Sequence, residues 1–243
     1  MSDTTPRPSV ASEPTDRQVF IDDQADIRII PTFDEMPLNH DLLRGVYSHG
    51  FERPSAIQQR AILPMTRGGD VIAQAQSGTG KTGAFSIGVL QRMDFRFGRL
   101  QALILSPTRE LALQTHEVVS SLGIYLSDGQ PFCHTFVGGT EVASDLRCLQ
   151  AGCIVAIGTP GRIINLIERG ALRTDNLKVL VLDEADEMLS EDFCKQISEI
   201  FKYLPRDIQI ALFSATMPEG VLSLAAKFMR DPTRILVRRE NLT

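Results

Sequence analysis

The sequence predicts an α/β fold in which a doubly wound, mostly parallel sheet is flanked by helices. Short runs of β-branched and aliphatic residues alternate along the chain with amphipathic stretches of about ten to fifteen residues. Some runs are apolar throughout, as in the Val-Leu-Val-Leu of residues 179–182, which is typical of strands buried on both faces. Repeated strand–helix order gives parallel strands covered on both sides. Ligands of such sheets bind beyond the carboxyl ends of the strands, so we expect the chemistry directly after strands.

The individual elements follow from this alternation. Two amphipathic segments at residues 38–47 and 54–62 predict helices that precede the sheet. β-branched and aliphatic runs predict strands at residues 70–73, 102–105, 132–137, 154–157, 179–182, 209–213 and 235–237. The segments between them predict helices at residues 81–93, 109–122, 161–168, 192–203 and 219–228.

The composition limits the classes of protein. The chain has 243 residues, of which 43% are hydrophobic, and a formal net charge of −5. No apolar run approaches the roughly 18 residues of a membrane span, and the start lacks the order of a secretory signal, so we expect an intracellular protein with no membrane role. The acidic balance argues against a generic coat for nucleic acid, because nonspecific affinity for phosphates comes mainly from excess Lys and Arg. Any contact with nucleic acid must come from a few placed groups.

Residues 1–29 are predicted to form a disordered acidic arm, and residues 30–243 a single folded domain. The arm is rich in Ser, Thr and Pro, and its six acids and three bases carry −3 of the net charge of −5. The four cysteines form no Cys-x-x-Cys pair, and the four histidines do not cluster with them. We therefore expect neither a zinc site nor a disulfide.

A glycine-rich loop follows the first strand. Residues 75–82 read Ala-Gln-Ser-Gly-Thr-Gly-Lys-Thr, the spacing of a phosphate-binding loop except that Ala75 replaces the first glycine. Backbone N–H groups at a helix N-terminus hold anionic oxygens. Lys81 would contact the β- and γ-phosphates of a nucleotide, and Thr82 would offer its hydroxyl to Mg²⁺. The expected nucleotide-binding residues of this loop are Ser77, Gly78, Thr79, Gly80, Lys81 and Thr82.

The same loop has two other interpretations. Residues 78–83 match the dinucleotide fingerprint Gly-x-Gly-x-x-Gly, but that fingerprint expects an acid about 20 residues further on, and residues 100–106 contain none. The glycines alone could also form a structural turn. A triphosphate site accounts for the Lys-Thr pair, which has no role in binding a dinucleotide.

Acidic residues follow another buried strand, at residues 179–182. Asp183, Glu184 and Asp186 could be ordinary helix N-terminal residues that offset the dipole. Together with the phosphate loop on a separate strand, they favour a nucleoside triphosphatase. Asp183 would help to hold the hydrated Mg²⁺, and Glu184 would orient and deprotonate the attacking water. The predicted catalytic residues are therefore Lys81, Asp183 and Glu184.

These residues resemble the motifs of the DEAD-box RNA helicases, a family of RecA-like P-loop triphosphatases. The Asp-Glu-Ala-Asp of residues 183–186 is the family's signature. The segments that are similar to the Q motif and to motifs Ia, GG, Ib and III lie, in order, at residues 50–58, 107–112, 138–139, 159–162 and 214–216. The resemblance covers about residues 31–243 and implies ATP and Mg²⁺ as ligands.

In the family the Q motif reads adenine. Gln58 suits this role, because its amide has both a donor and an acceptor, and Phe51 offers a ring for stacking. The alternative is that Phe51 and Ile57 only staple a helix. We expect Phe33, at the family's upstream aromatic position, to pack beneath the motif.

Motifs Ia, GG and Ib hold the backbone of single-stranded RNA in the family, without reading bases. The alternative for the two arginines in these motifs is an ion pair with a helix acid. The resemblance also implies that Asp186, Ser214 and Thr216 couple nucleotide to RNA. The alternative for Ser214 and Thr216 is a cap on the helix near Pro218. The candidate RNA contacts are Thr108, Arg109, Gly139, Thr159 and Arg162.

Wider similarity points to the subfamily of eukaryotic initiation factor 4A and its nuclear exon-junction paralogue. Residues 51–82, 181–189 and 227–232 are similar to both, and residues 171–174 and 203–205 lean towards the paralogue. The resemblance implies an RNA helicase in translation initiation or mRNA processing. The alternatives are an ATP-locked RNA clamp and a single-domain regulatory nucleotide binder. The implied location is the cytoplasm or the nucleus, with the nucleus slightly favoured.

Family members have a second RecA-like domain, whose arginine-rich motif is not found in this sequence. We therefore expect an N-terminal domain that ends at the interdomain linker. An arginine finger contributes about 10³–10⁵ in rate, so this chain alone should hydrolyse ATP hardly at all. The implied partners are the second domain, a helical-repeat scaffold or exon-junction-type proteins, and we expect a monomer.

Overall fold

The computed structural model describes residues 27–237 and contains a seven-stranded sheet in the order β3-β4-β2-β5-β6-β1-β7. Every neighbouring pair of strands is parallel, which confirms the predicted fold class. The predicted arm lies outside the described residues up to residue 26. The strands are β1 Val71–Gln74, β2 Ala102–Leu105, β3 Cys133–Phe136, β4 Val155–Gly158, β5 Val179–Leu182, β6 Gln209–Ser214 and β7 Thr233–Leu236.

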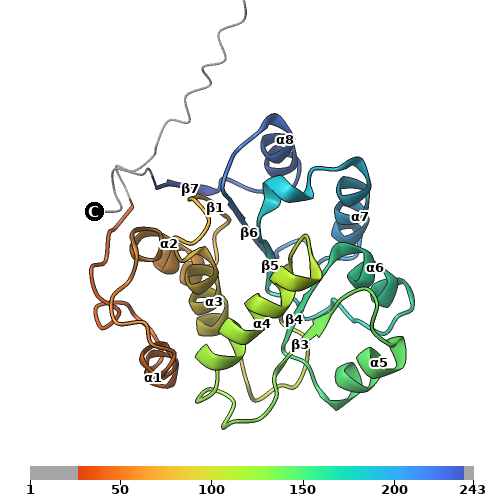
Figure 1. Cartoon of the computed structure of the whole chain (residues 1–243), viewed down its shortest axis with the longest axis horizontal. Helices are drawn as coiled ribbons and strands as arrows, with labels where there is room; N and C mark the ends of the chain where they lie inside the picture. Colours follow the sequence, from red (N-terminus) through yellow and green to blue (C-terminus); the bar gives the residue numbers. More distant parts are fainter. Residues whose placement is uncertain (1–26, 238–243) are drawn as a thin grey trace, which may run out of the picture.

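The helices lie on the two faces of this sheet (Figure 1). No helix among residues 27–237 is both long and apolar enough to cross a membrane. The helices are α1 His40–Ser48, α2 Ala56–Arg67, α3 Lys81–Arg92, α4 Arg109–Leu122, α5 Val142–Ala151, α6 Pro160–Glu168, α7 Glu191–Lys202 and α8 Glu219–Phe228, with a short 3₁₀ helix, η2, at Ala185–Met188.

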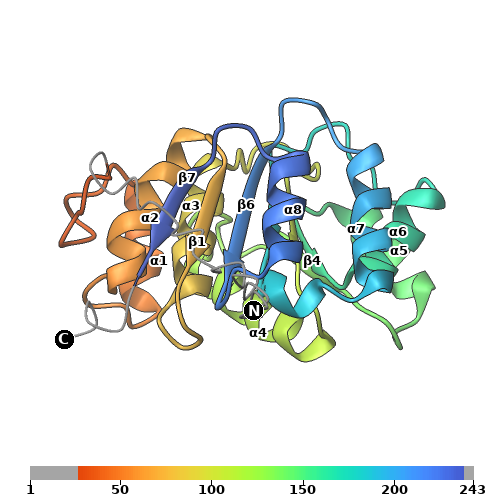
Figure 2. The ribbon, with the colours of Figure 1, turned by 90° about the horizontal axis from the view of Figure 1, so that it is seen from above.

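Alternate residues of the central strands supply two separate cores. In β2, Ile104 belongs to one buried cluster, and Leu103 and Leu105 belong to the other, as the alternation of side chains along a strand requires. The first cluster includes side chains of α1 to α4, and the second packs against α5 to α8. Figure 2 shows β1 and β6 between α3 on one side and α8 on the other. In the first core, Phe85 of α3 meets Phe213 of β6 edge to face, with ring centroids 5.2 Å apart.

Several elements differ from the sequence-based expectations, and three of the differences have a clear structural cause. The helix α5 was not expected, although Val142, Leu146 and Leu149 have helical spacing and pack against the second core. The helix α2 continues past Pro64 because Leu63 and Met65 extend its buried stripe, and it ends only at Gly68, which has a left-handed φ of +86°. Edge strand β7 begins two residues earlier than expected, because its pairing with β1 starts at Thr233 opposite Val71.

The strand order brings three loops together at the carboxyl edge of the sheet. β6 lies between β1 and β5. The glycine-rich loop follows β1, the acidic segment follows β5, and Ser214 ends β6. All strands are parallel, so these three loops leave the same edge, and this edge is where a ligand of such a sheet binds.

Candidate functional site

The loop between β1 and α3 curls around the amino group of Lys81. Gly78 has a φ of +79° and Gly80 a φ of +96°, a left-handed conformation that glycine adopts without steric cost. The Lys81 amino group is buried and donates a hydrogen bond to the Ala75 carbonyl oxygen at 2.9 Å. The helix α3 begins at Lys81, so the free N–H groups of its first turn adjoin the loop. This is the geometry of an anion site.

Glu184 connects the acidic segment to this loop. Its Oε2 atom lies 3.0 Å from Lys81 Nζ, and the two side chains are only 14% and 4% exposed. The Ser77 hydroxyl donates to Glu184 Oε1 at 3.3 Å. Glu184 also has a φ of +49°, a costly conformation for a residue with a side chain. The structure therefore brings Ser77, Lys81 and Glu184 together at the carboxyl edge of the sheet.

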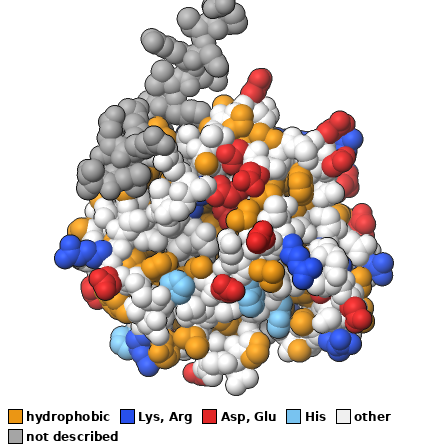
Figure 3. Space-filling model, viewed as in Figure 1, with side chains coloured by type: hydrophobic (Ala, Val, Ile, Leu, Met, Phe, Trp, Pro, Cys, Tyr) orange, Lys and Arg blue, Asp and Glu red, His pale blue; other side chains and the backbone are white. Residues whose placement is uncertain are grey.

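Asp183 and Thr82 supply the oxygens that could hold a divalent cation. The Asp183 side chain is buried, and its pKa is raised to about 7 by burial first and by the neighbouring Glu184 charge second, while Lys81 opposes the shift. Thr82 is half-buried in the first turn of α3. Little positive charge lies near this buried carboxyl group, so the group is suited to bind Mg²⁺, which prefers oxygen ligands. Figure 3 shows acidic side chains gathered over the region of η2.

Gln58 lies under the glycine-rich loop. The residue is buried, with an exposed fraction of 3%. The Oε1 atom accepts from the Ser55 N–H at 2.8 Å, and Nε2 donates to the Gly80 carbonyl oxygen at 3.2 Å. A Cβ atom on Gly80 or Gly83 would lie 2.8 or 2.6 Å from Gln58 Nε2. Close packing on Gln58 therefore accounts for these two glycines, without any need for the dinucleotide interpretation. The structure ties the predicted adenine-reading side chain directly to the phosphate loop.

Phe51 lies beside Gln58 and stacks on Phe33, with ring centroids 6.4 Å apart and an interplanar angle of 19°. Phe33 is fully buried, which confirms that it packs beneath the motif. Phe51 itself is half-buried. A Cβ atom on Gly83 would lie 2.9 Å from the Phe51 ring, so the ring also packs against α3.

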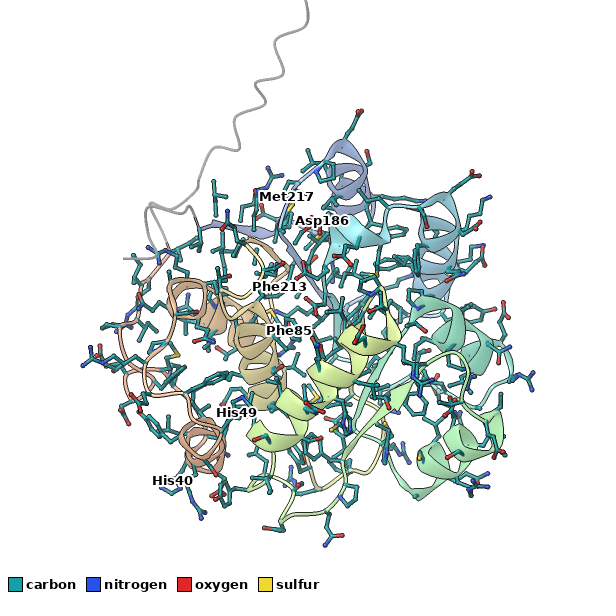
Figure 4. The ribbon with its side chains drawn as sticks, in the orientation of Figure 1. His40, His49, Phe85, Asp186, Phe213 and Met217 are labelled. Carbon is teal, nitrogen blue, oxygen red and sulfur yellow. The ribbon has the colours of Figure 1, made fainter. Side chains whose placement is uncertain are left out.

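Asp186 joins the segment after β5 to the segment after β6. Its Oδ2 atom accepts from the Thr216 hydroxyl at 2.7 Å and from the Thr216 N–H at 3.0 Å. Ser214 Oγ accepts from the Asp186 N–H at 3.2 Å and donates to the Thr216 carbonyl oxygen at 2.7 Å. Burial opposes ionisation of Asp186, but the hydrogen bonds from Thr216 and Ser214 outweigh it and lower the pKa. Figure 4 shows Asp186 beside Met217, close to the end of β6.

The alternative role of Ser214 and Thr216, as a cap on the following helix, is wrong. The N-cap residue of α8 is Pro218, and no side chain caps the helix. The two hydroxyl groups bond within the Asp186 network instead.

All five candidate RNA contacts lie in exposed or half-exposed positions after β2, β3 and β4. Thr108 caps α4, and its hydroxyl accepts from the Leu111 N–H at 3.2 Å. Arg109 is exposed, and a Cβ atom on Gly139, which has a φ of +81°, would lie 3.5 Å from Arg109 Nη1. Thr159 precedes α6 as its N-cap residue. These residues form a row along the carboxyl edge, next to the acidic segment that follows β5.

Arg162 differs from the other candidates. It forms an ion pair with Asp145 of α5, and the two side chains are 10% and 7% exposed. Its guanidinium group also donates to the Thr140 hydroxyl at 3.1 Å and to the Thr140 carbonyl oxygen at 2.9 Å. The ion pair with a helix acid, our alternative interpretation, is therefore what the structure shows for Arg162. Within residues 27–237, Arg109 has no such ion pair.

Comparison with known proteins identifies the family. The model of the DEAD/DEAH box helicases matches residues 55–224. The chain belongs to this family. It is 69% identical over 232 residues to a probable eukaryotic initiation factor 4A of Trypanosoma cruzi, which covers 95% of the chain and 57% of that protein. It is 57% identical over 215 residues to the ATP-dependent RNA helicase eIF4A of Neosartorya fischeri, covering 88% of the chain and 53% of that protein.

Solved structures of DEAD-box proteins have the same fold. A DEAD box protein from Methanococcus jannaschii superimposes with a TM-score of 0.81 at 35% identity, over 86% of this chain and 57% of that one. Dbp5 of S. cerevisiae, bound to RNA and ADP BeF3, gives a TM-score of 0.78 at 35% identity, over 87% of this chain and 53% of that one. The chain thus spans about half the length of these DEAD-box proteins.

Two residues of this DEAD-box domain were missed in the sequence. Asp145 was overlooked because α5 was not expected, and the helical spacing of Val142, Leu146 and Leu149 was the signal that could have revealed it. Thr140 follows the GG motif directly, but nothing in the sequence indicates that its carbonyl and hydroxyl oxygens bind Arg162.

Proposed function

We propose that this chain is the nucleotide-binding half of an ATP-dependent DEAD-box RNA helicase of translation initiation. The observation that carries the proposal is the meeting of Lys81, Ser77 and Glu184 at the carboxyl edge of the sheet. The phosphates of ATP would replace Glu184 as the partner of Lys81. Mg²⁺, held by Thr82 and by Asp183 partly through water, would neutralise charge that develops on those phosphates.

The hydrolysis and unwinding of the whole protein need a second RecA-like domain. The chain covers 57% of the Trypanosoma relative, which leaves length for such a domain. Glu184, released from Lys81, would orient and deprotonate the attacking water. The hydrogen bonds among Asp186, Ser214 and Thr216 would then pass the state of the nucleotide to the RNA-binding edge.

The ligand on that edge is the backbone of single-stranded RNA. Four residues that follow three neighbouring strands could contact its phosphates: Thr108, Arg109, Gly139 and Thr159. Contacts to phosphates do not depend on the base sequence. Dbp5, of the same fold, is bound to RNA in its structure. Such a placement needs few charges, so it is compatible with an acidic chain.

The names of the relatives favour initiation over the exon junction. Both the Trypanosoma and the Neosartorya relatives are named as initiation factor 4A, so the clamp alternative is not favoured. We accordingly propose a location in the cytoplasm, where translation starts, although the sequence resemblance leaned slightly towards the nucleus. A helical-repeat scaffold of the initiation machinery is the protein partner that goes with this role.

The direct test is RNA-stimulated ATP hydrolysis by the protein extended through a second RecA-like domain. We expect single-stranded RNA to raise the rate at least about tenfold, and Glu184→Gln to remove the increase, since a positioned general base contributes about 10²–10⁴. Glu187→Gln, in the same segment, is the control. A rate that RNA does not change would contradict the proposal.

Adenine nucleotides should bind this chain more tightly than guanine nucleotides. We expect ADP to bind about tenfold more tightly than GDP in titration calorimetry, since a mismatched base leaves buried polar groups unpaired. Gln58→Glu keeps the acceptor for the Ser55 N–H but loses the amide donor, so it should weaken ADP binding and reduce the preference. Gln59→Glu, at the next position, should leave it intact. Equal affinities of the wild-type chain for ADP and GDP would refute the assignment of Gln58.

The affinity for magnesium nucleotide should depend on pH through Asp183. Its pKa is raised to about 7, so in the metal-free protein the carboxyl group is increasingly protonated below that pH. A protonated carboxyl is a poor ligand for Mg²⁺, and therefore the affinity for ADP with Mg²⁺ should rise between about pH 6 and pH 8. Binding of ADP in EDTA should change less over the same range. An equal pH dependence with and without Mg²⁺ would show that Asp183 does not act through the metal.

A further inference from the structure

We propose that His49 is a positioning residue that sets the orientation of the Phe51 ring for stacking on the nucleotide base. This inference rests on the proposed function, in which Phe51 stacks on adenine. The imidazole ring of His49 meets the Phe51 ring edge to face, with centroids 4.6 Å apart and an interplanar angle of 76°. The contact is closer than that of Phe51 with Phe33, where the centroids are 6.4 Å apart.

The backbone from His49 to Phe51 forms a turn that brings the two rings together. His49 is the C-cap residue that follows α1, and its backbone N–H donates to the Gly45 carbonyl oxygen at 2.9 Å. Gly50 then takes a left-handed φ of +98°, which turns the chain back, and the Phe51 N–H donates to the Val46 carbonyl oxygen at 3.2 Å. A glycine suits this turn because a side chain at such a φ is strained. The turn holds both rings against the end of α1.

The imidazole ring is itself fixed from the opposite side. His49 Nδ1 hydrogen-bonds with the Ser121 hydroxyl of α4 at 2.9 Å. The two helices meet closely at this point, since a Cβ atom on Gly45 would lie 1.9 Å from the Leu122 carbonyl oxygen. Figure 4 shows His49 between α1 and the end of α4. His49 is therefore held by its backbone in α1 and by its side chain on α4.

The neighbours of Phe51 include the Phe33 ring, the His49 ring and the backbone of Gly83, and Phe51 also packs against the first core cluster. Phe33 and Gly83 belong to the core packing, whereas His49 is half-buried and at the rim. Without the His49 imidazole ring, the Phe51 ring would be free to rotate towards the space that the imidazole had filled. If the Phe51 ring must be ordered when a ligand binds, the affinity for any ligand with a base falls. The affinity for a ligand without a base does not change.

The test compares ADP with inorganic tripolyphosphate, both with Mg²⁺, in titration calorimetry on the full chain. We expect His49→Ala to weaken ADP binding about 3- to 10-fold, the range of an aromatic pair, and to leave tripolyphosphate affinity unchanged. His49→Phe, which retains a ring edge, should restore ADP binding to within about twofold. His49→Asn, which can still bond to Ser121 but has no ring, should not. His40→Ala, on the same helix with a side chain 85% exposed, is the control.

Two results would overturn the inference: unchanged ADP affinity in His49→Ala, or an equal loss for ADP and tripolyphosphate, which would indicate a general structural role. If His49→Ala does not fold, Ser121→Ala replaces it. This variant frees the imidazole ring and should weaken ADP binding about twofold with no effect on tripolyphosphate; no change would again refute the role of His49. A wild-type chain that binds neither ADP nor GDP would instead contradict the proposed function itself.

Discussion

Lys81→Ala is expected to lower the affinity of this chain for ADP with Mg²⁺ about 100-fold or more. Hydrogen bonds to charged groups contribute about 1.5–3 kcal/mol each, and the Lys81 amino group would contact the β-phosphate of ADP. The substitution also leaves Glu184, which is 14% exposed, with no cation beside it at the place where the phosphates bind. Titration calorimetry measures the loss directly. Lys195→Ala is the control, since that side chain is 67% exposed on α7.

Glu184→Gln should have the opposite effect on the same measurement. The ion pair between Glu184 and Lys81 competes with the nucleotide for the lysine, and a glutamine removes both that competition and the repulsion between two anions. We expect ADP to bind about 3- to 10-fold more tightly. If Lys81→Ala binds ADP within threefold of the wild type, the lysine does not contact phosphate. If Glu184→Gln weakens binding, the ion pair organises the loop and does not compete with the nucleotide.

The sheet could be predicted from the sequence because burial on both faces makes its central strands apolar. The Val-Leu-Val-Leu of β5 is apolar at every position because it supplies both cores, with Val179 and Val181 in one and Leu180 and Leu182 in the other. The edge strand β7 was placed less well. Its first residues, Thr233 and Arg234, are polar, and a hydrogen-bonded pairing with β1 leaves no pattern in the sequence.

The site could be predicted as a set of loops, but not as a set of contacts. Parallel strands carry the loops after β1, β5 and β6 to one edge, so residues 75–82, 183–186 and 214–216 had to meet. Which side chains pair within that edge depends on distances that spacing does not encode. The bond from Gln58 to the Gly80 carbonyl oxygen is one example, and the burial of Asp183 that raises its pKa to about 7 is another.

The two arginines proposed from the same motifs show this limit most clearly. Both follow a strand and both lie in the first turn of a helix, so the sequence does not distinguish Arg109 from Arg162. The structure separates them: Arg109 is exposed beside Gly139, whereas the Arg162 side chain is only 10% exposed and is paired with Asp145. We infer that Arg109 contacts the RNA backbone and that Arg162 acts by holding Thr140, the residue after the GG motif, in place.

Arg162→Ala should therefore lower the free energy of unfolding by about 3 kcal/mol or more, because it leaves the Asp145 carboxylate buried and unpaired. Arg109→Ala should change it by less than about 0.5 kcal/mol, as expected for an exposed side chain. Denaturation in urea measures both. The double variant Asp145→Ala with Arg162→Ala should lose less than the sum of the single variants, since the two side chains interact directly.

RNA binding should show the reverse order of effects once the proteins are folded. In the two-domain protein, Arg109→Ala should reduce the slope of log affinity against log salt by about 0.7, the change for one contact with single-stranded phosphate. Arg162→Ala should leave that slope unchanged, because its charge is already paired with Asp145 and releases no counterion on binding. A reduced slope in Arg162→Ala, with its stability intact, would mean that the ion pair opens and that Arg162 contacts the RNA directly. An unchanged slope in Arg109→Ala would remove the only exposed arginine from the proposed RNA contacts.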